Sequence, residues 1–315
     1  MNDGYRHLFG PVRSRRLGRS LGLDLVPFKV CSFDCPYCQV GATTTQTLVR
    51  SEYVPVAEVL AEFDRWMVAD GKADHLTLAG AGEPTLHLHF GKVLEALAAR
   101  TSIPRVLLSN GSLFHLAEVR AAACKANIVK GTLAAWDQSS FQAVHHPHSS
   151  LVFETFFKGL KTMRAEFQGE FWLEVFLVAG VNDDPVQVAH IAALAREIRP
   201  DRIHLNTAIR PPQAVAVEAV SGERLAALAG MFTPAAELSV SPPPSASNGS
   251  QVPVDSGQLE GRLLSLIQRH PCTLADMSST MGSDLQEVEG VLSGLLGRGR
   301  IRTDLRQGTL FYLAV

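Results

Sequence analysis

Short apolar runs alternate with longer amphipathic segments over the first two thirds of the chain. The apolar runs have the length and composition of buried strands, and the amphipathic segments have the periodicity of helices. The predicted strands are Leu21–Val26, His75–Ala79, Arg105–Leu108, Asn127–Leu133, Phe171–Val178 and Arg202–Asn206. The predicted helices are Val56–Ala69, Phe90–Ala99, Leu113–Ala123, Val152–Glu166 and Pro185–Ile198.

This strand–helix alternation predicts an α/β protein whose parallel strands are joined by crossover helices. A barrel and an open doubly wound sheet both fit the pattern. In either fold, binding and catalytic groups gather at the carboxyl ends of the strands. We therefore expect the functional site in the loops that follow the predicted strands.

The alternation ends near Leu238, and a different organisation follows. Residues 239–256 are rich in Pro, Ser and Gly, which is typical of a partly extended linker. Residues 257–315 predict three short helices and a hairpin, the order of a winged-helix domain. We thus expect one domain over residues 1–238, a linker, and a second domain over residues 257–315. In the second domain the predicted helices are Gln258–Gln268, Thr273–Thr280 and Leu285–Leu296, and the strands of the predicted hairpin are Arg300–Asp304 and Thr309–Leu313.

The composition is that of a globular protein. The chain has 315 residues, 46% of them hydrophobic, and a formal net charge of −2. This length allows two domains, and the charge gives no indication of wholesale binding to nucleic acid or membranes. The first residues lack the apolar run of a signal peptide, and no apolar stretch is long enough to span a bilayer. We expect a soluble, cytoplasmic protein without a membrane partner.

Three cysteines, Cys31, Cys35 and Cys38, follow the first predicted strand with the spacing C-x3-C-x2-C. Three thiolates this close favour an iron–sulfur cluster. A disulfide is not expected, because the triplet is odd and no secretory signature is present. Zinc stays open as an alternative: no fourth Cys or His stands nearby, but a ligand distant in the sequence can complete such a site.

A four-iron cluster with three protein thiolates leaves one iron open to a small molecule. Tyr37 lies inside the triplet and either packs in the core or forms a wall for a planar ring beside the cluster.

Two later loops carry candidate ligand contacts. Gly80, Gly82 and Glu83 follow the second predicted strand, where the glycines allow a close approach to the backbone and the carboxylate can accept from an ammonium group. Ser109 and Asn110 follow the third predicted strand and can hold a ribose or a carboxylate. Taken alone, an ordinary turn explains each of these loops almost as well.

In this order, the motifs resemble the radical S-adenosylmethionine superfamily: C-x3-C-x-aromatic-C, then a Gly-Gly-Glu-like loop after the next strand. Residues 9–22, the loop Gly80-Ala-Gly-Glu-Pro-Thr-Leu86 and Val181-Asn-Asp183 resemble a branch that includes relatives of the wybutosine-forming tRNA enzymes. The resemblance covers roughly residues 5–212. It implies a partial (β/α)6 TIM-type barrel, here followed by a small C-terminal winged-helix domain.

The resemblance implies that Cys31, Cys35 and Cys38 hold one 4Fe–4S cluster, with S-adenosylmethionine on the open iron. Around it would lie Gly80, Gly82 and Glu83 at the amino group, Ser109 and Asn110 near the ribose or carboxylate, and Tyr37 by the adenine. One electron from the cluster would cleave the cofactor, and the 5′-deoxyadenosyl radical would abstract a substrate hydrogen. The protein would orient the reactants and exclude water and oxygen. An electron donor such as flavodoxin or ferredoxin is implied as a partner.

The chain departs from the family pattern at two points. Its glycine loop reads Gly-Ala-Gly-Glu rather than Gly-Gly-Glu, which puts the backbone contacts around Ala81 in doubt. No cysteine precedes Cys31, and only Cys124 and Cys272 remain. A second cysteine-bound cluster, as in the wybutosine enzymes, is therefore not expected, and their particular reaction does not transfer to this chain.

Three polar residues on predicted strands are further candidates for cofactor or substrate contacts. Lys130 lies in an apolar strand, where a charge is costly unless it is paired or faces a polar cavity. Glu174 has the same context and is either its partner or a cofactor contact. Asn206 ends the sixth predicted strand, as a site residue or as a simple strand-end cap.

Two other groups admit a functional reading. His145, His146 and His148 are read as an exposed loop rather than a metal site, because no carboxylate or cysteine completes a ligand set. Four arginines before the first predicted strand can meet phosphate or carboxylate groups, with a solvated surface as the alternative. They are Arg13, Arg15, Arg16 and Arg19.

The role of the C-terminal domain stays open. Its third predicted helix begins with the acidic run Ser283–Glu289, which repels phosphates. The hairpin carries Arg300, Arg302 and Arg306, so a nucleic-acid contact through it remains an alternative to docking of a peptide or protein.

Our leading hypothesis is a radical S-adenosylmethionine enzyme acting on an unidentified substrate, with an RNA base or a peptide as candidates. The alternative is a cluster-containing winged-helix regulator that binds nucleic acid without turnover.

Overall fold

The computed structural model describes residues 5–238, 256–306 and 308–315. Its main feature is an eight-stranded sheet in the order β1-β2-β5-β6-β7-β8-β9-β10. From β2 to β10 neighbouring strands run parallel, and β1 pairs antiparallel with β2. The strands are β1 (Leu8–Ser14), β2 (Gly18–Leu23), β5 (His75–Leu78), β6 (Arg105–Leu108), β7 (Ile128–Thr132), β8 (Glu170–Leu177), β9 (Arg202–Thr207) and β10 (Glu237–Leu238). Within the described ranges β1 and β10 do not pair, so the barrel stays open on one side.

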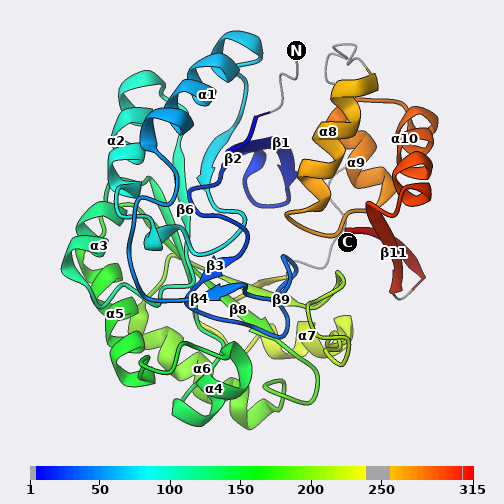
Figure 1. Ribbon diagram of the computed structural model, residues 1–315. Coiled ribbons are helices and arrows are strands. Elements are labelled where there is room, and N and C mark those ends of the chain that lie inside the picture. The colour runs from blue at the N-terminus through cyan, green and yellow to red at the C-terminus, as the bar shows by residue number, and fades with distance from the viewer. Residues whose placement is uncertain (1–4, 239–255, 307) are drawn as a thin grey trace.

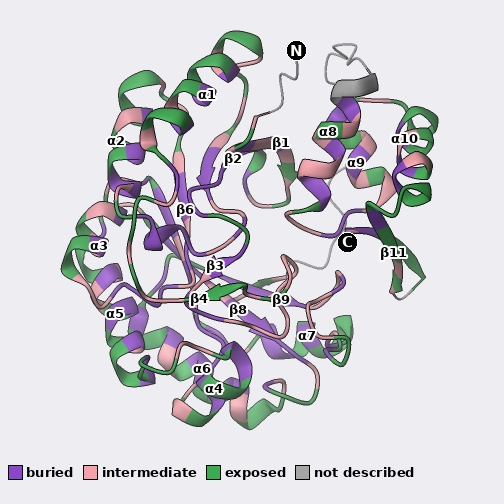
Figure 2. Cartoon of the chain, in the orientation of Figure 1, coloured by how far each residue is buried: buried purple, intermediate pink, exposed green. Residues whose placement is uncertain are grey.

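Helices cover the outer side of this curved sheet, as Figure 1 shows. Each buries an apolar stripe against the strands and leaves its other side to solvent, which Figure 2 shows as purple and green faces of one helix. In α1, for example, the buried stripe contains Val59, Phe63 and Trp66. The helices are α1 (Val56–Ala69), α2 (Phe90–Arg100), α3 (Ala117–Ala123), α4 (Gln138–His145), α5 (Phe153–Glu166), α6 (Pro185–Ile198) and α7 (Gly222–Ala229).

The predicted α/β class and the partial barrel are confirmed. The six predicted parallel strands correspond to β2, β5, β6, β7, β8 and β9, and the bounds of α1 and α6 agree with the prediction at both ends. Helix α3 begins later than predicted, because turns closed by Phe114 N to Gly111 O and Leu116 N to Leu113 O precede it. Strands β1 and β10, the short strands β3 (Val30–Cys31) and β4 (Thr45–Gln46), and helices α4 and α7 were not predicted from the sequence.

The C-terminal unit has the predicted order of three helices and a hairpin. It consists of α8 (Ser256–Ile267), α9 (Leu274–Met281), α10 (Leu285–Gly297), β11 (Ile301–Arg306) and β12 (Thr309–Ala314). Its core is separate from that of the barrel and includes Leu263, Met277 and Leu292. Helices α8 and α9 pack against β1, whose Val12 contacts this core (Figure 1). The winged-helix assignment stays a prediction, and the predicted linker lies almost wholly outside the described residues.

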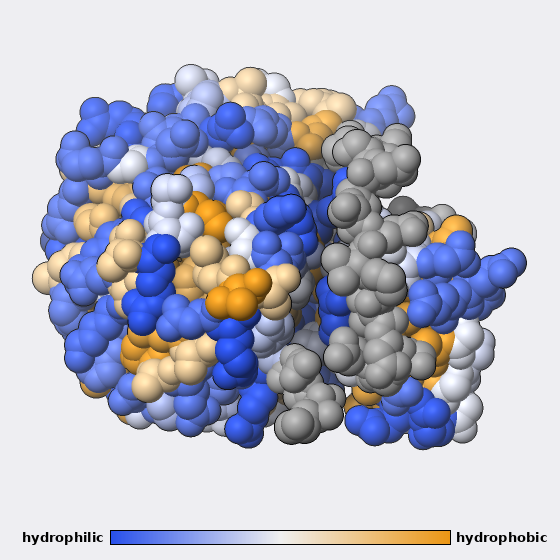
Figure 3. Space-filling view, turned by 90° about the horizontal axis from the view of Figure 1, so that it is seen from above, coloured by the Kyte–Doolittle hydropathy of each residue, from blue (hydrophilic) through white to orange (hydrophobic). Residues whose placement is uncertain are grey.

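The helices and the surface can be compared with what a membrane-spanning protein requires. Within the described ranges, every helix is too short or too polar to cross a membrane. Figure 3 shows a face on which hydrophilic side chains predominate and apolar ones form small separate areas.

Candidate active site

The three cysteines lie on a segment that follows β2, as predicted. Cys31 ends the short strand β3 (Val30–Cys31), which pairs with β4 (Thr45–Gln46). Backbone hydrogen bonds hold the segment: Thr47 N donates to Cys31 O at 3.0 Å, Cys38 N to Cys35 O at 3.0 Å, and Gln213 N to Cys38 O at 2.8 Å. All three thiols are half-buried. The triplet is thus a fixed loop that reaches the segment after β9.

The chemistry of this donor set fits a cluster better than a single zinc ion. In the described part of the chain, no three His, Cys, Asp or Glu side chains converge closely enough to bind one metal ion. Zinc needs ligands at about 2.0–2.3 Å from one point, whereas each thiolate of a cubane cluster binds a different iron. Burial, and then Glu83, raise the pKa of Cys31 to about 12. Iron cations would offset the cost of ionising such thiols.

A buried lysine adds positive charge beside the thiols. Lys29 is 3% exposed, and its Nζ donates to Cys38 Sγ at 3.0 Å and to Gly41 O at 2.6 Å. Burial opposes the ammonium charge, but attraction by Cys38 and the other two cysteines outweighs it and raises the pKa of Lys29. Lys29 was not predicted as a site residue, although a lysine two positions before Cys31 in an apolar run was a usable signal.

The glycine loop after β5 is bonded directly to the strand of the first cysteine. Glu83 N donates to Val30 O at 3.0 Å, and a Cβ at Gly82 would lie 2.0 Å from that same oxygen. Gly80 has a φ of +124°, which favours glycine. Ala81 N donates to Asp24 Oδ1 at 2.7 Å, so the alanine in the loop is accommodated with a fixed backbone. The 3-10 turn Pro84–Leu86 follows.

Glu83 joins the glycine loop to the Ser-Asn loop after β6. Its buried carboxylate accepts from Ser109 Oγ and from Asn110 N, both at 2.7 Å. Burial raises its pKa, although these donors act in the opposite direction. Asn110 Nδ2 in turn donates to Ser32 Oγ at 2.9 Å and contacts Cys31 Sγ at 3.6 Å. Three motifs that are far apart in the sequence therefore form one connected site.

Tyr37 lies between the triplet and the barrel wall. Its ring stacks on Phe176 with centroids 4.2 Å apart, and its hydroxyl bonds His145 Nδ1 at 2.8 Å. Burial, and then Cys35, raise the pKa of Tyr37, and Glu174 contributes too. One face of the Tyr37 ring thus packs in the core, as one of the two sequence-based interpretations expected.

The interpretation of His145 as part of an exposed loop is wrong. It ends α4 and is fully buried, with Nδ1 3.7 Å from Cys35 Sγ. Burial lowers its pKa to about 3, so the ring is neutral at physiological pH. His146, with a φ of 42°, ends the helix and is exposed, as expected for the loop.

Lys130, Glu174 and Asn206 lie on adjacent strands and form one polar network inside the barrel. Glu174 Oε1 accepts from Lys130 Nζ at 2.8 Å and from Asn206 Nδ2 at 2.5 Å. Arg16 joins them, with Nη1 at 3.2 Å from Glu174 Oε1 and Nη2 at 3.1 Å from Asn206 Oδ1. Burial acts to raise the pKa of Glu174, but Lys130 and Arg16 together lower it to about 2. The predicted Lys130–Glu174 pairing is confirmed.

The C-terminal unit reaches the glycine loop through one carboxylate that the sequence analysis missed. Arg269 Nε donates to Asp24 Oδ2 at 2.5 Å, while the other oxygen of Asp24 accepts from Ala81 N. Arg269 also donates to Ser265 O and lies over the Phe9 ring. Asp24 is 5% exposed, and its burial raises its pKa. A lone acid in the apolar run 21–26 was the available signal.

The cysteine triplet, the glycine loop and the Ser-Asn loop lie in a part of the chain that a family model matches. The family model "Radical SAM superfamily" matches residues 25–192. A protein named GTPase Obg from Brachyspira hyodysenteriae is 30% identical over 308 residues, which are 98% of this chain and 45% of that protein. A UPF0026 protein from Methanocaldococcus jannaschii is 32% identical over 206 residues, 65% of this chain and 64% of that protein. The chain thus spans less than two thirds of either relative.

Among solved structures, a radical SAM methyltransferase from Sphaerobacter thermophilus is similar to this chain, with a TM-score of 0.47 and 18% identity. The match covers 70% of this chain and 65% of that one.

Proposed function

The chain belongs to the radical S-adenosylmethionine superfamily, and we propose that it cleaves S-adenosylmethionine reductively and takes a hydrogen atom from a substrate. The expected class, a radical S-adenosylmethionine enzyme, and the expected cofactors, one 4Fe–4S cluster and S-adenosylmethionine, are those of this superfamily. When bound, the cluster supplies the electron for this cleavage. The residues of the chain bind and orient the cofactors and exclude water from them.

The proposed roles follow the connected loops. Cys31, Cys35 and Cys38 bind three irons. Glu83 fixes the position of the glycine loop relative to the Ser-Asn loop, because its carboxylate accepts hydrogen bonds from both Ser109 and Asn110. Thr85 N and Thr85 Oγ1 also donate to Glu83 Oε1, so only Oε2, which accepts from Asn110 N, keeps a lone pair for the cofactor's ammonium group. Gly80 and Gly82 permit the close backbone approach, and the residues after β6 take the ribose or carboxylate.

Other residues form the walls of the site. The stacked ring of Tyr37 offers its second face to the adenine. The network of Lys130, Glu174 and Asn206 lines the barrel interior and contacts the cofactor or the substrate.

One observation supports this proposal above the others: Asn110 contacts Cys31 with its side chain and Glu83 with its backbone. A structural turn would not require the cysteine segment, the glycine loop and the Ser-Asn loop to meet through buried polar groups, which cost free energy unless they are satisfied. The alternative, a regulator that binds nucleic acid without turnover, gains no support, because neither the family match nor the names of the relatives indicate such a role.

We further propose a cytoplasmic enzyme that takes its electron from a flavodoxin or a ferredoxin and acts on an RNA base or a peptide. The winged-helix unit then serves as a substrate-facing module. These assignments rest on the resemblance of the motifs.

The test is anaerobic reconstitution with iron and sulfide, followed by reduction in the presence of S-adenosylmethionine. We expect a cluster absorbance band and reduction-dependent 5′-deoxyadenosine, measured by mass spectrometry. A cluster-loaded protein that forms no 5′-deoxyadenosine contradicts the proposal.

A pair of cysteine variants tests the ligand assignment. Cys35→Ala should lose the cluster spectrum. Cys124→Ala, at an exposed cysteine whose thiol contacts Glu166 O, should keep it. An intact cluster in Cys35→Ala refutes the assignment of that ligand.

A further inference from the structure

The hydroxyl of Tyr37 lies between one cysteine of the triplet and a buried histidine. It bonds His145 Nδ1 at 2.8 Å, and Cys35 Sγ lies 3.7 Å from the same nitrogen. The hydroxyl also donates to Cys35: burial raises the pKa of this thiol, and the hydrogen bond from Tyr37 acts in the opposite direction. Cys35, Tyr37 and His145 thus form one hydrogen-bonded group, the Cys35 network, that ends on an expected cluster ligand.

Backbone pairing holds His145 beside the cysteine segment. Asp34 N donates to His146 O at 3.0 Å, and His148 N donates to Ser32 O at 2.8 Å. The end of α4 is therefore attached to the segment that carries the triplet. The histidine ring has a fixed position relative to the thiols, although the two segments are more than a hundred residues apart in the sequence.

The surroundings of the neutral His145 ring decide which of its nitrogens carries the proton. The side chain is fully buried, and within the described ranges Nε2 has no hydrogen-bond partner. The rings of Phe33 and Phe141 pack around it, with centroids 5.1 and 5.6 Å away. A buried N–H group without an acceptor is rare and costly, so the proton is assigned to Nδ1. Nδ1 then donates to the Tyr37 hydroxyl, whose own hydrogen is left for Cys35.

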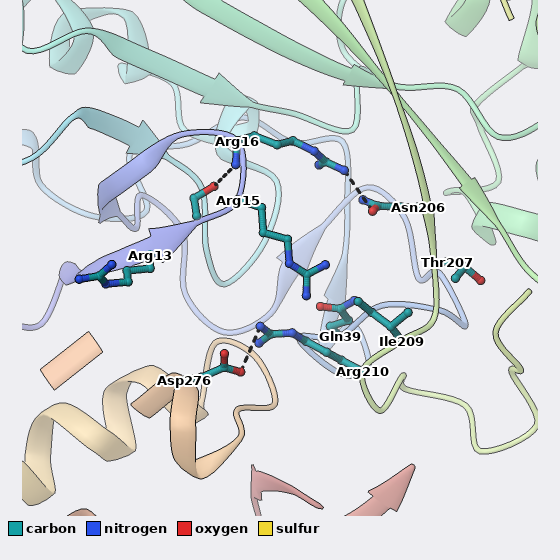
Figure 4. Close-up of a pocket in the computed structure, with 10 residues that line it drawn as sticks. Arg13, Arg15, Arg16, Gln39, Asn206, Thr207, Ile209, Arg210 and Asp276 are labelled. Carbon is teal, nitrogen blue, oxygen red and sulfur yellow. Dashed lines mark hydrogen bonds and ion pairs between the residues drawn. The ribbon is translucent and has the colours of Figure 1, made fainter. Parts of the chain in front are cut away.

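The Cys35 network is separate from the cavity that borders the triplet on its other side. That cavity, of about 270 Å³, is lined by Gln39, which directly follows Cys38, and none of its lining residues belongs to the network (Figure 4). The ring of Tyr37 is instead stacked on Phe176. Water in the cavity therefore does not contact the network, and a donor lost at Cys35 is not replaced from there.

A hydrogen bond to a cluster thiolate changes how readily the cluster accepts an electron. Reduction by one electron adds negative charge, and a donor at a cysteine sulfur stabilises the reduced form more than the oxidised form. The other two thiols also have donors: Lys29 Nζ lies 3.0 Å from Cys38 Sγ, and Asn110 Nδ2 lies 3.6 Å from Cys31 Sγ. The donor at Cys35 differs from these because a second buried residue orients it.

We propose that Tyr37 donates a hydrogen bond to the Cys35 thiolate of the bound cluster, and that His145 is a positioning residue that orients this hydroxyl. The pair raises the reduction potential of the cluster, which brings it closer to that of a one-electron donor such as flavodoxin or ferredoxin. The inference rests on the proposed function for the presence of the cluster. It adds to that function a residue of α4 that lies outside the cysteine, glycine and Ser-Asn motifs.

Potentiometric titration of the reconstituted protein, followed by electron paramagnetic resonance, tests the hydrogen bond. The titration omits S-adenosylmethionine, so that a contact between Tyr37 and adenine does not contribute. Tyr37→Phe keeps the stacked ring and should lower the equilibrium constant for one-electron reduction about tenfold, which is about 59 mV. The matched control is Tyr53→Phe, which removes a hydroxyl that donates to Val49 O at 2.8 Å and should leave the potential unchanged.

Two substitutions test the positioning role of His145. His145→Leu removes the group that orients the hydroxyl and should lower the same equilibrium constant about threefold. His145→Asn, whose amide nitrogen can donate from near the position of Nδ1, should restore a potential close to that of the wild type. If the ring only fills space, the two variants should have the same potential.

Electron–nuclear double resonance of the reduced protein in D2O gives an independent readout. A deuteron on the Tyr37 hydroxyl should couple to the cluster in the wild type and in Tyr53→Phe, and Tyr37→Phe should lack this coupling. The proposal is overturned if Tyr37→Phe and Tyr53→Phe have the same potential, if their deuteron spectra are the same, or if His145→Asn behaves like His145→Leu. Each of these results leaves 5′-deoxyadenosine formation by the wild type intact. A loaded wild type that forms no 5′-deoxyadenosine contradicts the proposed function and leaves the hydrogen bond standing.

Discussion

Replacing Glu174 by Gln tests whether the charge network inside the barrel is a tightly coupled unit. Glu174 is the only carboxylate among the four connected side chains, and it faces two cations, Lys130 and Arg16. Side-chain exposure at these three positions is 19%, 14% and 18%, so water screens the interaction weakly. Glutamine keeps the size of the side chain and removes its charge. The variant therefore leaves two buried cations without an anion.

The magnitude follows from the pKa of Glu174. A fall from 4.5 to about 2 corresponds to roughly 3 kcal/mol, at about 1.4 kcal/mol for each pKa unit. Burial lowers the pKa of Lys130 despite its partner, so desolvation takes back part of this gain. Breaking a buried pair by removing one partner typically costs about 3–5 kcal/mol. We expect Glu174→Gln to lower the free energy of unfolding by about 3 kcal/mol at pH 7.

Urea unfolding measures this loss, because an uncharged denaturant leaves ion pairs unscreened. The matched control is Glu197→Gln, which removes the carboxylate of an exposed pair: Lys161 Nζ lies 2.7 Å from Glu197 Oε2, and the side chains are 43% and 52% exposed. This control should change stability by less than about 1 kcal/mol. Equal losses in the two variants would refute the reasoning.

The same variant gives a pH dependence. Because folding depresses the pKa of Glu174, its contribution is fully present above pH 4.5 and is lost as the pH falls through about 2. The stability difference between the wild type and Glu174→Gln should therefore shrink across this interval. A difference that stays constant from pH 7 to pH 2 contradicts the assigned direction.

Three further predictions concern the loops of the site. Lys29→Met should lower the cluster's reduction potential by on the order of 100 mV, because the variant loses a cation beside Cys38. A potentiometric titration followed by electron paramagnetic resonance measures the potential, and an unchanged potential would contradict the prediction. Gly82→Ala should weaken S-adenosylmethionine binding at least tenfold, because the added Cβ would clash with Val30 O. The control is Gly290→Ala, whose Cβ would meet no atom within 4 Å and should leave the affinity unchanged. Similar affinities in the two variants would argue against the assignment of the glycine loop. Asp24→Asn should weaken S-adenosylmethionine binding about tenfold by releasing Arg269. The control is Asp70→Asn, which removes a half-buried carboxylate paired with Arg19, and equilibrium dialysis measures both variants.

The regular elements were predictable where local signals and burial agree. Helix α6 has its predicted bounds because Asp184 and Gln187 form a capping box and Pro185 takes the first helical position. Helix α4 was missed although Asp137 caps it through Ser140, because its eight residues are mostly polar. Strand β1 was missed because Pro11 and Arg13 do not follow the alternation of a buried strand. Pairing with β2 and contacts with α1 and the C-terminal unit stabilise it.

The site was predictable to the level of its motifs. Glycines, thiols and a Ser-Asn pair after successive strands locate the loops, since parallel strands end on one edge. The contacts that join them were not predictable, because nothing local relates Glu83 to Asn110 or Asp24 to Arg269, which are 245 positions apart. The roles of Lys29 and His145 were missed for the same reason: each depends on a thiol that tertiary folding brings near.

The contacts of the C-terminal unit change how its function should be understood. From its element order alone, it is a module that binds nucleic acid or a partner through its third helix or its hairpin. The structure instead directs two arginine–carboxylate pairs to the barrel: Arg269 holds Asp24 behind the glycine loop, and Asp276 holds Arg210 in the segment after β9. The Asp24 side chain is 7% exposed and the Asp276 side chain 24%, so the loss of its partner would cost most at Asp24. Any movement of the unit therefore perturbs the glycine loop and the segment after β9 together, which makes the unit a structural support of both.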